Sequence, residues 1–223
     1  MKNILTISLL VSTLQVSGQT NSLIRLNHIM LVLDSVTYQE VSHSEFIRTE
    51  FGFISEKKLD HWKGLYLIGE SNYLELFHPK SIKNENLNPG VNWICLTSMK
   101  SNYIQQLDTS SVFIYDYDEQ FNYYSLALND STYPITTQEM KQAQYESWVK
   151  KPFHESMEFN PVDYNSPADA DSSKNFPLQD IVAIHLTINS NDSLSYISYL
   201  SNCGYTITNT VDTPMFRTGI KQK

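Results

Sequence analysis

The sequence predicts an α+β fold in which short strands outnumber helices. Tyr and Phe, which favour strands, contribute 14 and 10 of the 223 residues. Short apolar runs alternate with polar turns, and a few segments carry apolar residues at helical spacing. The order strand, helix, strand at 26–59 returns at 181–210, which indicates an internal repeat.

The composition is that of a folded protein and argues against a nucleic-acid partner. Hydrophobic residues make up 41% of the chain and charged residues 18%, which is enough apolar material for a core. Lys and Arg number 16 against 24 Asp and Glu, so the net charge is −8, whereas proteins that bind phosphate backbones usually carry a basic surface. No dinucleotide-binding or P-loop motif is present.

The first 18 residues have the three regions of a secretory signal peptide. Residues 1–3 include Lys2, residues 4–16 are mostly apolar, and residues 16–18 are small or β-branched. The apolar run is shorter than the roughly 20 residues that a membrane-spanning helix needs. We therefore expect an exported protein, periplasmic or extracellular, with no membrane span after cleavage.

Cleavage after Gly18 is the first testable expectation. Mass spectrometry of the protein exported from a native-like bacterial host should show a new N-terminus near Gln19. A retained Met1 would contradict the signal peptide.

Residues 19–90 are expected to form a first β-α-β-β-β module. A polar residue before an apolar helical face and a glycine after it are typical helix boundaries, and Ser42 and Gly52 provide them. The expected elements are a strand at 26–33, a helix at 42–51, and strands at 53–59, 64–69 and 73–77.

The rest of the chain predicts an intervening strand-helix unit at 91–159, a loop or linker at 160–179 and a partial second module at 180–223. Thr137 is the expected cap of a helix at 137–149. The other expected elements are strands at 91–97, 112–115, 123–128, 181–188, 205–210 and 215–220, and helices at 100–107 and 193–203. Cys95 and Cys203 are expected to be buried thiols in preference to a disulfide.

Several motifs resemble the glyoxalase/bleomycin-resistance/dioxygenase superfamily, whose members are also called vicinal oxygen chelate proteins. Residues 27–32 (NHIMLV) resemble its opening strand, residues 50–53 (EFGF) the turn after its first helix, and residues 73–77 (YLELF) its fourth strand. Residues 184–188 (IHLTI) and 203–205 (CGY) resemble the start of a second module. The unit that begins near residues 92–94 (NWI) resembles a larger, poorly characterised glyoxalase-like branch.

The resemblance implies paired β-α-β-β-β modules whose mixed, curved sheets surround a cavity. Enzymes of the superfamily hold a divalent metal there, with ligands from the first and fourth strands of each module. By position, the implied ligands are His28, Glu75 and His185, which could form a facial triad. The fourth ligand has no counterpart, because the second module ends at Lys223 before a fourth strand, so a complete set cannot be assigned.

Glu75 is the most informative of these residues. A single carboxylate between apolar neighbours faces water, a cavity or a partner, and strand alternation places it beside Tyr73 on one face. We expect that face to line the cavity, although a solvent-facing Glu75 and hydrogen-bonded core histidines are the alternatives. The expected ligand-binding residues are His61, Trp62, Tyr66 and Tyr73.

Three functions remain open at the level of sequence. The first is an exported protein that binds a small molecule in the cavity between the modules. The second is a lyase, isomerase or dioxygenase of the same superfamily that depends on a divalent metal. The third is a non-catalytic interaction module. No catalytic residue can be assigned, the partner is a small molecule, and a homodimer is an open option.

Overall fold

The computed structural model describes residues 23–58, 62–83, 85–107, 113–126, 135–150, 192–205, 208–210 and 213–215, and single residues between 152 and 184. Residues 23–182 form one compact unit, and the described residues beyond 183 belong to another. The predicted signal peptide and almost all of the predicted linker lie outside the described residues. The α+β fold class is confirmed, because the first unit contains an eight-stranded mixed sheet with few helices.

The first module has the predicted β-α-β-β-β order. In the sheet its strands run in the order β2-β3-β4-β1, with β1 parallel to β4 and the other neighbours antiparallel. Its elements are β1 (Ile24–Val32), α1 (Ser35–His43), a π-helical turn η1 (Ile47–Phe51), β2 (Phe53–Lys58), β3 (Lys63–Ile68) and β4 (Tyr73–Phe77).

The helix of this module begins earlier than predicted. Asp34, and not Ser42, is the N-cap, because its carboxylate accepts hydrogen bonds from the backbone N–H groups of Val36 and Thr37 at 3.0 Å. The predicted start of the helix at residue 42 is therefore wrong. Its second half is the separate turn η1, which ends at Gly52 as expected.

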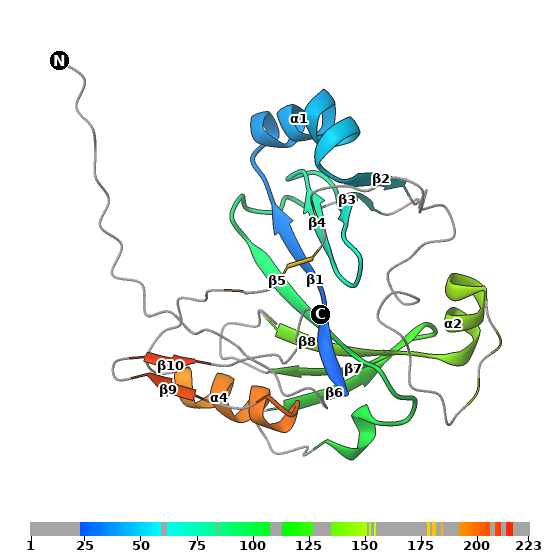
Figure 1. The fold of residues 1–223 in the computed structure, drawn as a ribbon, viewed down its shortest axis with the longest axis vertical. Coiled ribbons are helices and arrows are strands. Elements are labelled where there is room, and N and C mark those ends of the chain that lie inside the picture. Colours follow the sequence, from blue (N-terminus) through cyan, green and yellow to red (C-terminus); the bar gives the residue numbers. More distant parts are fainter. Residues whose placement is uncertain are drawn as a thin grey trace. The chain divides into compact units, whose positions relative to one another are not determined.

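A second module of the same topology occupies residues 92–140, within the segment predicted as an intervening strand-helix unit. Its strands run in the order β5-β8-β7-β6, with β5 parallel to β8, and β5 pairs antiparallel with β1 to join the two halves (Figure 1). Its elements are β5 (Asn92–Ser98), a 3-10 turn η2 (Ile104–Gln106), β6 (Phe113–Tyr117), β7 (Phe121–Leu126) and β8 (Ile135–Met140).

The helix predicted at 137–149 is half strand. Thr137 lies in the middle of β8, which pairs with β5 on one side and β7 on the other, and the helix α2 begins only at Gln142 (Gln142–Val149). Because β-branched residues pack well in a strand that has neighbours on both sides, the tertiary pairing overrides the capping pattern.

The helix predicted at 100–107 is only the short turn η2, and Glu139 anchors the start of this turn. Its carboxylate accepts hydrogen bonds from the backbone N–H groups of Asn102 at 2.9 Å, Tyr103 at 2.7 Å and Ile104 at 3.0 Å. These contacts satisfy the donors at the start of the turn and tie it to β8, which fixes its position in the second module.

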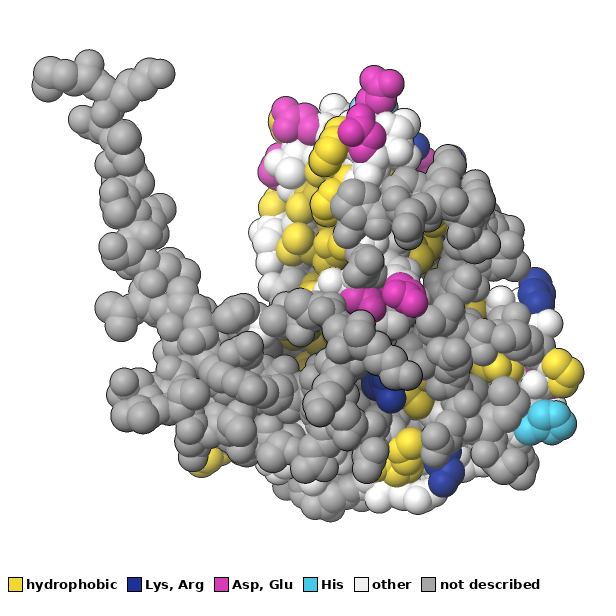
Figure 2. Space-filling view, in the orientation of Figure 1, with side chains coloured by type: hydrophobic (Ala, Val, Ile, Leu, Met, Phe, Trp, Pro, Cys, Tyr) yellow, Lys and Arg dark blue, Asp and Glu magenta, His cyan; other side chains and the backbone are white. Residues whose placement is uncertain are grey.

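The two faces of the first module's sheet have different roles. The face toward α1 carries an apolar cluster built on Tyr38, Leu65, Leu67 and Leu76. Exposed acidic side chains lie around α1 and η1, where Figure 2 shows them gathered at one end of this view. Alternation places Tyr66 and Glu75 on the opposite face, which leaves that face for the candidate site.

The turn between β3 and β4 is held by Asp180. Its carboxylate accepts hydrogen bonds from the backbone N–H groups of Ser71 at 2.7 Å and Asn72 at 3.1 Å, and from the Ser71 hydroxyl at 2.6 Å. Asn72 in turn accepts a hydrogen bond from the N–H of Ile181 at 2.7 Å. These contacts fix the start of β4 just before Tyr73.

The C-terminal unit contains α4 (Ser193–Asn202), β9 (Thr208–Thr210) and β10 (Thr213–Met215). The helix predicted at 193–203 is confirmed. Of the strand predicted at 181–188, only Ile181 and Ile184 are described, and neither lies in a strand. Cys95 and Cys203 are buried thiols that form no disulfide. None of the helices in the described part of the chain is long and apolar enough to cross a membrane.

Candidate functional site

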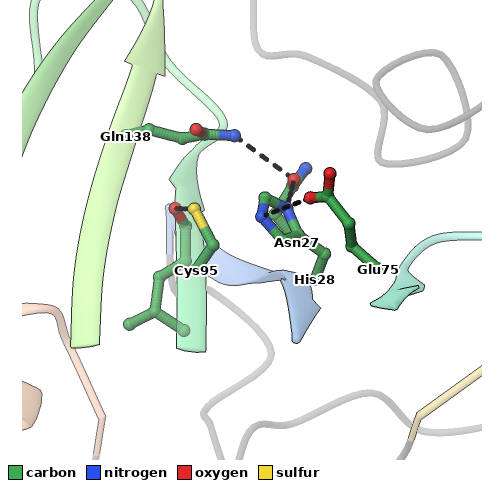
Figure 3. A network of polar contacts seen from close by, with 6 residues as sticks. Asn27, His28, Glu75, Cys95 and Gln138 are labelled. Carbon is green, nitrogen blue, oxygen red and sulfur yellow. Dashed lines mark hydrogen bonds and ion pairs between the residues drawn. The ribbon is translucent and has the colours of Figure 1, made fainter. Parts of the chain in front are cut away.

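His28 and Glu75 lie next to each other on the sheet face away from α1. His28 comes from β1 and Glu75 from the parallel neighbour β4, and Nε2 of the imidazole lies 3.7 Å from Oε2 of the carboxyl group (Figure 3). Both side chains are buried, with 6% and 5% of their surface exposed. Glu75 therefore does not face bulk solvent.

Aromatic rings continue from this pair along the same face. The His28 imidazole stacks on Tyr73 with 4.6 Å between the ring centroids, and Tyr73 lies 5.4 Å from Tyr66. Trp62 follows at 6.1 Å from Tyr66. Three of the four residues predicted to bind a ligand thus form one continuous wall beside His28, and the fourth, His61, lies outside the described residues.

Burial keeps the pair uncharged over a wide range of pH. Desolvation lowers the pKa of His28 to about 3, so its imidazole is neutral at physiological pH. Desolvation also raises the pKa of Glu75 to about 7, against the opposing effects of a hydrogen bond from Tyr66 and the positive charge of Lys57. The contact between His28 and Glu75 is therefore not a salt bridge near or below neutral pH.

Gly64 makes room for the carboxyl group. A Cβ at this position would lie 2.9 Å from the Trp62 ring, closer than real Cβ contacts permit, and 3.0 Å from Oε1 of Glu75, closer than most real Cβ contacts. Tyr66, the cross-strand neighbour of Glu75, donates the hydrogen bond from its hydroxyl. The carboxyl group thus lies over the glycine and against the aromatic wall.

The second module carries Cys95 and Gln138 at the positions that correspond to His28 and Glu75. His28 and Cys95 are partners across the central pair β1 and β5. Glu75 pairs with Met30, which is two residues after His28. In the same way, Gln138 pairs with Thr97, which is two residues after Cys95. The two modules therefore present unlike residues at equivalent positions.

A small pocket lies between the modules beside this set. Its volume is about 40 Å³, enough for a group of one to three heavy atoms but far below the roughly 300 Å³ of pockets that enclose a drug-sized ligand. The residues that line it are Asn27, Tyr73, Phe121, Gln138, Met140 and Trp148. Two amides and three aromatic rings are its main chemical features.

Lys57 brings a positive charge close to this region. Its ammonium lies 3.7 Å from the centroid of the Trp148 ring and 5.2 Å from that of Tyr66, which are cation–π contacts. The lysine thus connects β2 to the helix α2.

The residues described do not form a complete metal site. No group of three or more His, Cys, Asp or Glu side chains converges within the described part of the chain. His28 and Glu75 offer two ligands, but the Cys95 thiol points to the Leu96 carbonyl oxygen at 3.7 Å and burial raises its pKa. The third predicted ligand, His185, lies outside the described residues.

Sequence reasoning missed Asn27, Cys95, Gln138 and Lys57. The signal for Asn27 was present, because an amide next to His28 in an apolar strand requires a hydrogen-bond partner. Gln138 could not be found without recognising β8 as a strand. The metal-ligand and binding roles assigned to His28, Glu75, Trp62, Tyr66 and Tyr73 remain predictions.

One family model matches part of the chain. The family described as "Family of unknown function (DUF5829)" matches residues 26–110, which include His28 and Glu75. A search of curated proteins found no match. Among solved structures, the chain is similar to methylmalonyl-CoA epimerase from Mycobacterium tuberculosis, at 15% identity and a TM-score of 0.36, over 55% of this chain and 93% of that one.

Proposed function

We propose that this protein binds a small, polar, uncharged group of a ligand in the pocket between its two modules. The observation that supports this most is the placement of His28 and Glu75 on an inward face of the sheet. Burying two ionisable groups without charging them costs folding free energy, so their presence favours a role in recognition over one in stability.

The chemistry of the pocket defines the ligand class. Asn27 and Gln138 offer amide groups, while Tyr73, Phe121 and Trp148 provide flat apolar surface. A group that both donates and accepts hydrogen bonds, such as a carboxamide or a hydroxyl next to a carbonyl, matches such a lining. Export through the signal peptide at 1–18 is part of the proposal and would place this site outside the cytoplasm.

Acetamide and acetate are suitable probes, because they have the same size and differ in charge. NMR of the full chain labelled with ¹⁵N should show that acetamide shifts the side-chain amide resonances of Gln138 and the indole resonance of Trp148. At about −1 kcal/mol for each non-hydrogen atom, the expected dissociation constant is about millimolar. Acetate should shift them less, because an anion loses more hydration than acetamide when it enters a pocket lined by amides and aromatic rings.

Two variants provide the control. Gln138→Leu should abolish the acetamide response, whereas Ser125→Ala should keep it, because Ser125 contacts Thr136 elsewhere on the same face. Absence of any response to acetamide in the wild-type chain would refute the proposal.

A metal-dependent activity is the second candidate, favoured by the 3.7 Å approach of Nε2 of His28 to Oε2 of Glu75 from a first and a fourth strand. Calorimetric titration of the full chain with Zn²⁺ discriminates between the two. Stoichiometric binding that Glu75→Gln removes would support the metal site. Its absence, together with a response to acetamide, would support the metal-independent pocket.

A further inference from the structure

Asn27 occupies a β-bulge at the centre of the sheet. Leu26 pairs with Leu96 and His28 pairs with Cys95, so the register of β1 against β5 shifts by one residue at Asn27. A bulge changes the direction of side chains locally. Here it places the amide of Asn27 against the imidazole of the next residue (Figure 3).

A hydrogen-bonded chain crosses from the second module to His28. Nε2 of Gln138 donates to Oδ1 of Asn27 at 3.2 Å, and Nδ1 of His28 lies 2.6 Å from the same oxygen. An amide oxygen has two lone pairs and can accept both contacts. Because this oxygen only accepts, the hydrogen of the neutral imidazole must be on Nδ1.

This tautomer determines the state of the other ring nitrogen, Nε2. In a neutral imidazole with its hydrogen on Nδ1, Nε2 carries a lone pair. Nε2 is the atom that faces Glu75 at 3.7 Å, a separation too long for a direct hydrogen bond. The lone pair is therefore directed toward the space beside the carboxyl group.

We propose that Asn27, held by Gln138, is a positioning residue that fixes His28 in the tautomer with hydrogen on Nδ1. Nε2 then acts as a hydrogen-bond acceptor. The group that approaches it must be a donor, which narrows the ligand to one with an O–H or N–H group. Only this last step rests on the proposed function, because the tautomer exists without a ligand.

The tautomer can be measured directly by NMR of the full chain labelled with ¹⁵N-histidine. The sequence contains six histidines, and the resonances of His28 are identified by their loss in His28→Gln. The wild-type chain should show a protonated Nδ1 and an unprotonated Nε2. Asn27→Ala should change the ratio of the two tautomers toward Nε2–H by about tenfold, the effect of one hydrogen bond.

Two further variants separate positioning from a general effect on structure. Asn27→Asp keeps an acceptor oxygen and should keep the hydrogen on Nδ1, whereas Gln138→Leu, which loosens Asn27, should shift the ratio in the same direction as Asn27→Ala. Ser125→Ala should leave it unchanged. Gln138→Leu also serves if Asn27→Ala does not fold.

A hydrogen on Nε2 in the wild-type chain, or an unchanged ratio in both Asn27→Ala and Gln138→Leu, would overturn the proposal. The acetamide experiment is independent of this result. A normal acetamide response with the wrong tautomer would refute the role of Asn27 alone, and the expected tautomer without an acetamide response would refute the proposed function alone.

Discussion

The Glu75→Gln variant is expected to gain stability over the wild-type protein as the pH rises from 4 to above 7. The difference between their free energies of unfolding should change by about 3 kcal/mol in favour of the variant. Folding raises the pKa of this carboxyl group to about 7 from an ordinary value of 4.5. Between these two values the unfolded chain releases a proton that the folded chain keeps. The free energy of unfolding of the wild-type protein therefore falls as the pH rises through this window.

Glutamine cannot ionise, so the Glu75→Gln variant should not show this loss. The pKa of His28 is shifted in the opposite direction, to about 3, but both proteins contain this histidine and its effect cancels in their difference. Urea unfolding from pH 4 to pH 8 measures the difference. Glu56→Gln, at an exposed position in β2, is the matched control. A Glu75→Gln profile parallel to that of the wild type would contradict a buried carboxyl group.

Leu65→Ala should destabilise the protein by about 2–5 kcal/mol. Leu65 is completely buried in the cluster between the sheet and α1, so truncation removes apolar contacts and leaves a cavity. Val36→Ala, in α1 but 65% exposed, should change the free energy of unfolding by less than about 0.5 kcal/mol. Chemical denaturation of the three proteins measures both effects.

The same variant tests whether the sheet has two independent faces. Leu65 neighbours Tyr66 in the chain but points to the opposite side of β3, so its truncation should leave the tautomer of His28 unchanged. A cost below about 1 kcal/mol would show that Leu65 is not in a packed core. A changed His28 tautomer would show that the two faces are coupled.

Most strands could be predicted from the sequence because their apolar alternation is local. The strand β4 was predicted with its observed bounds, Tyr73–Phe77, and the proximity of His28 to Glu75 followed from the family resemblance. The strand β8 was not recognised, because Thr136, Thr137 and Glu139 are also typical of a helix start. Its pairing with two other strands is long-range, and a single sequence does not reveal it.

Because β8 was taken for a helix, the repeat of strands at 92–140 was predicted as a strand-helix unit. The partial second module predicted at 180–223 lies mostly outside the described residues and stays a prediction. With β8 assigned as a helix, Gln138 could not be aligned with Glu75, and the equivalent positions in the two modules were lost. The bulge at Asn27 is likewise set by how β1 meets β5, and not by any local pattern. The strand β8 accounts for the missed Gln138, and the bulge accounts for the contact of Asn27 with His28.

The most direct test of the buried, uncharged pair is a ¹³C NMR titration of the Glu75 side-chain carboxyl group in the full chain, with Glu75→Gln used to identify its resonance. If the carboxyl group lies on the inward face beside His28, its titration midpoint should lie near pH 7. A midpoint near 4.5, the ordinary value for a glutamate in water, would place Glu75 in solvent and contradict the site.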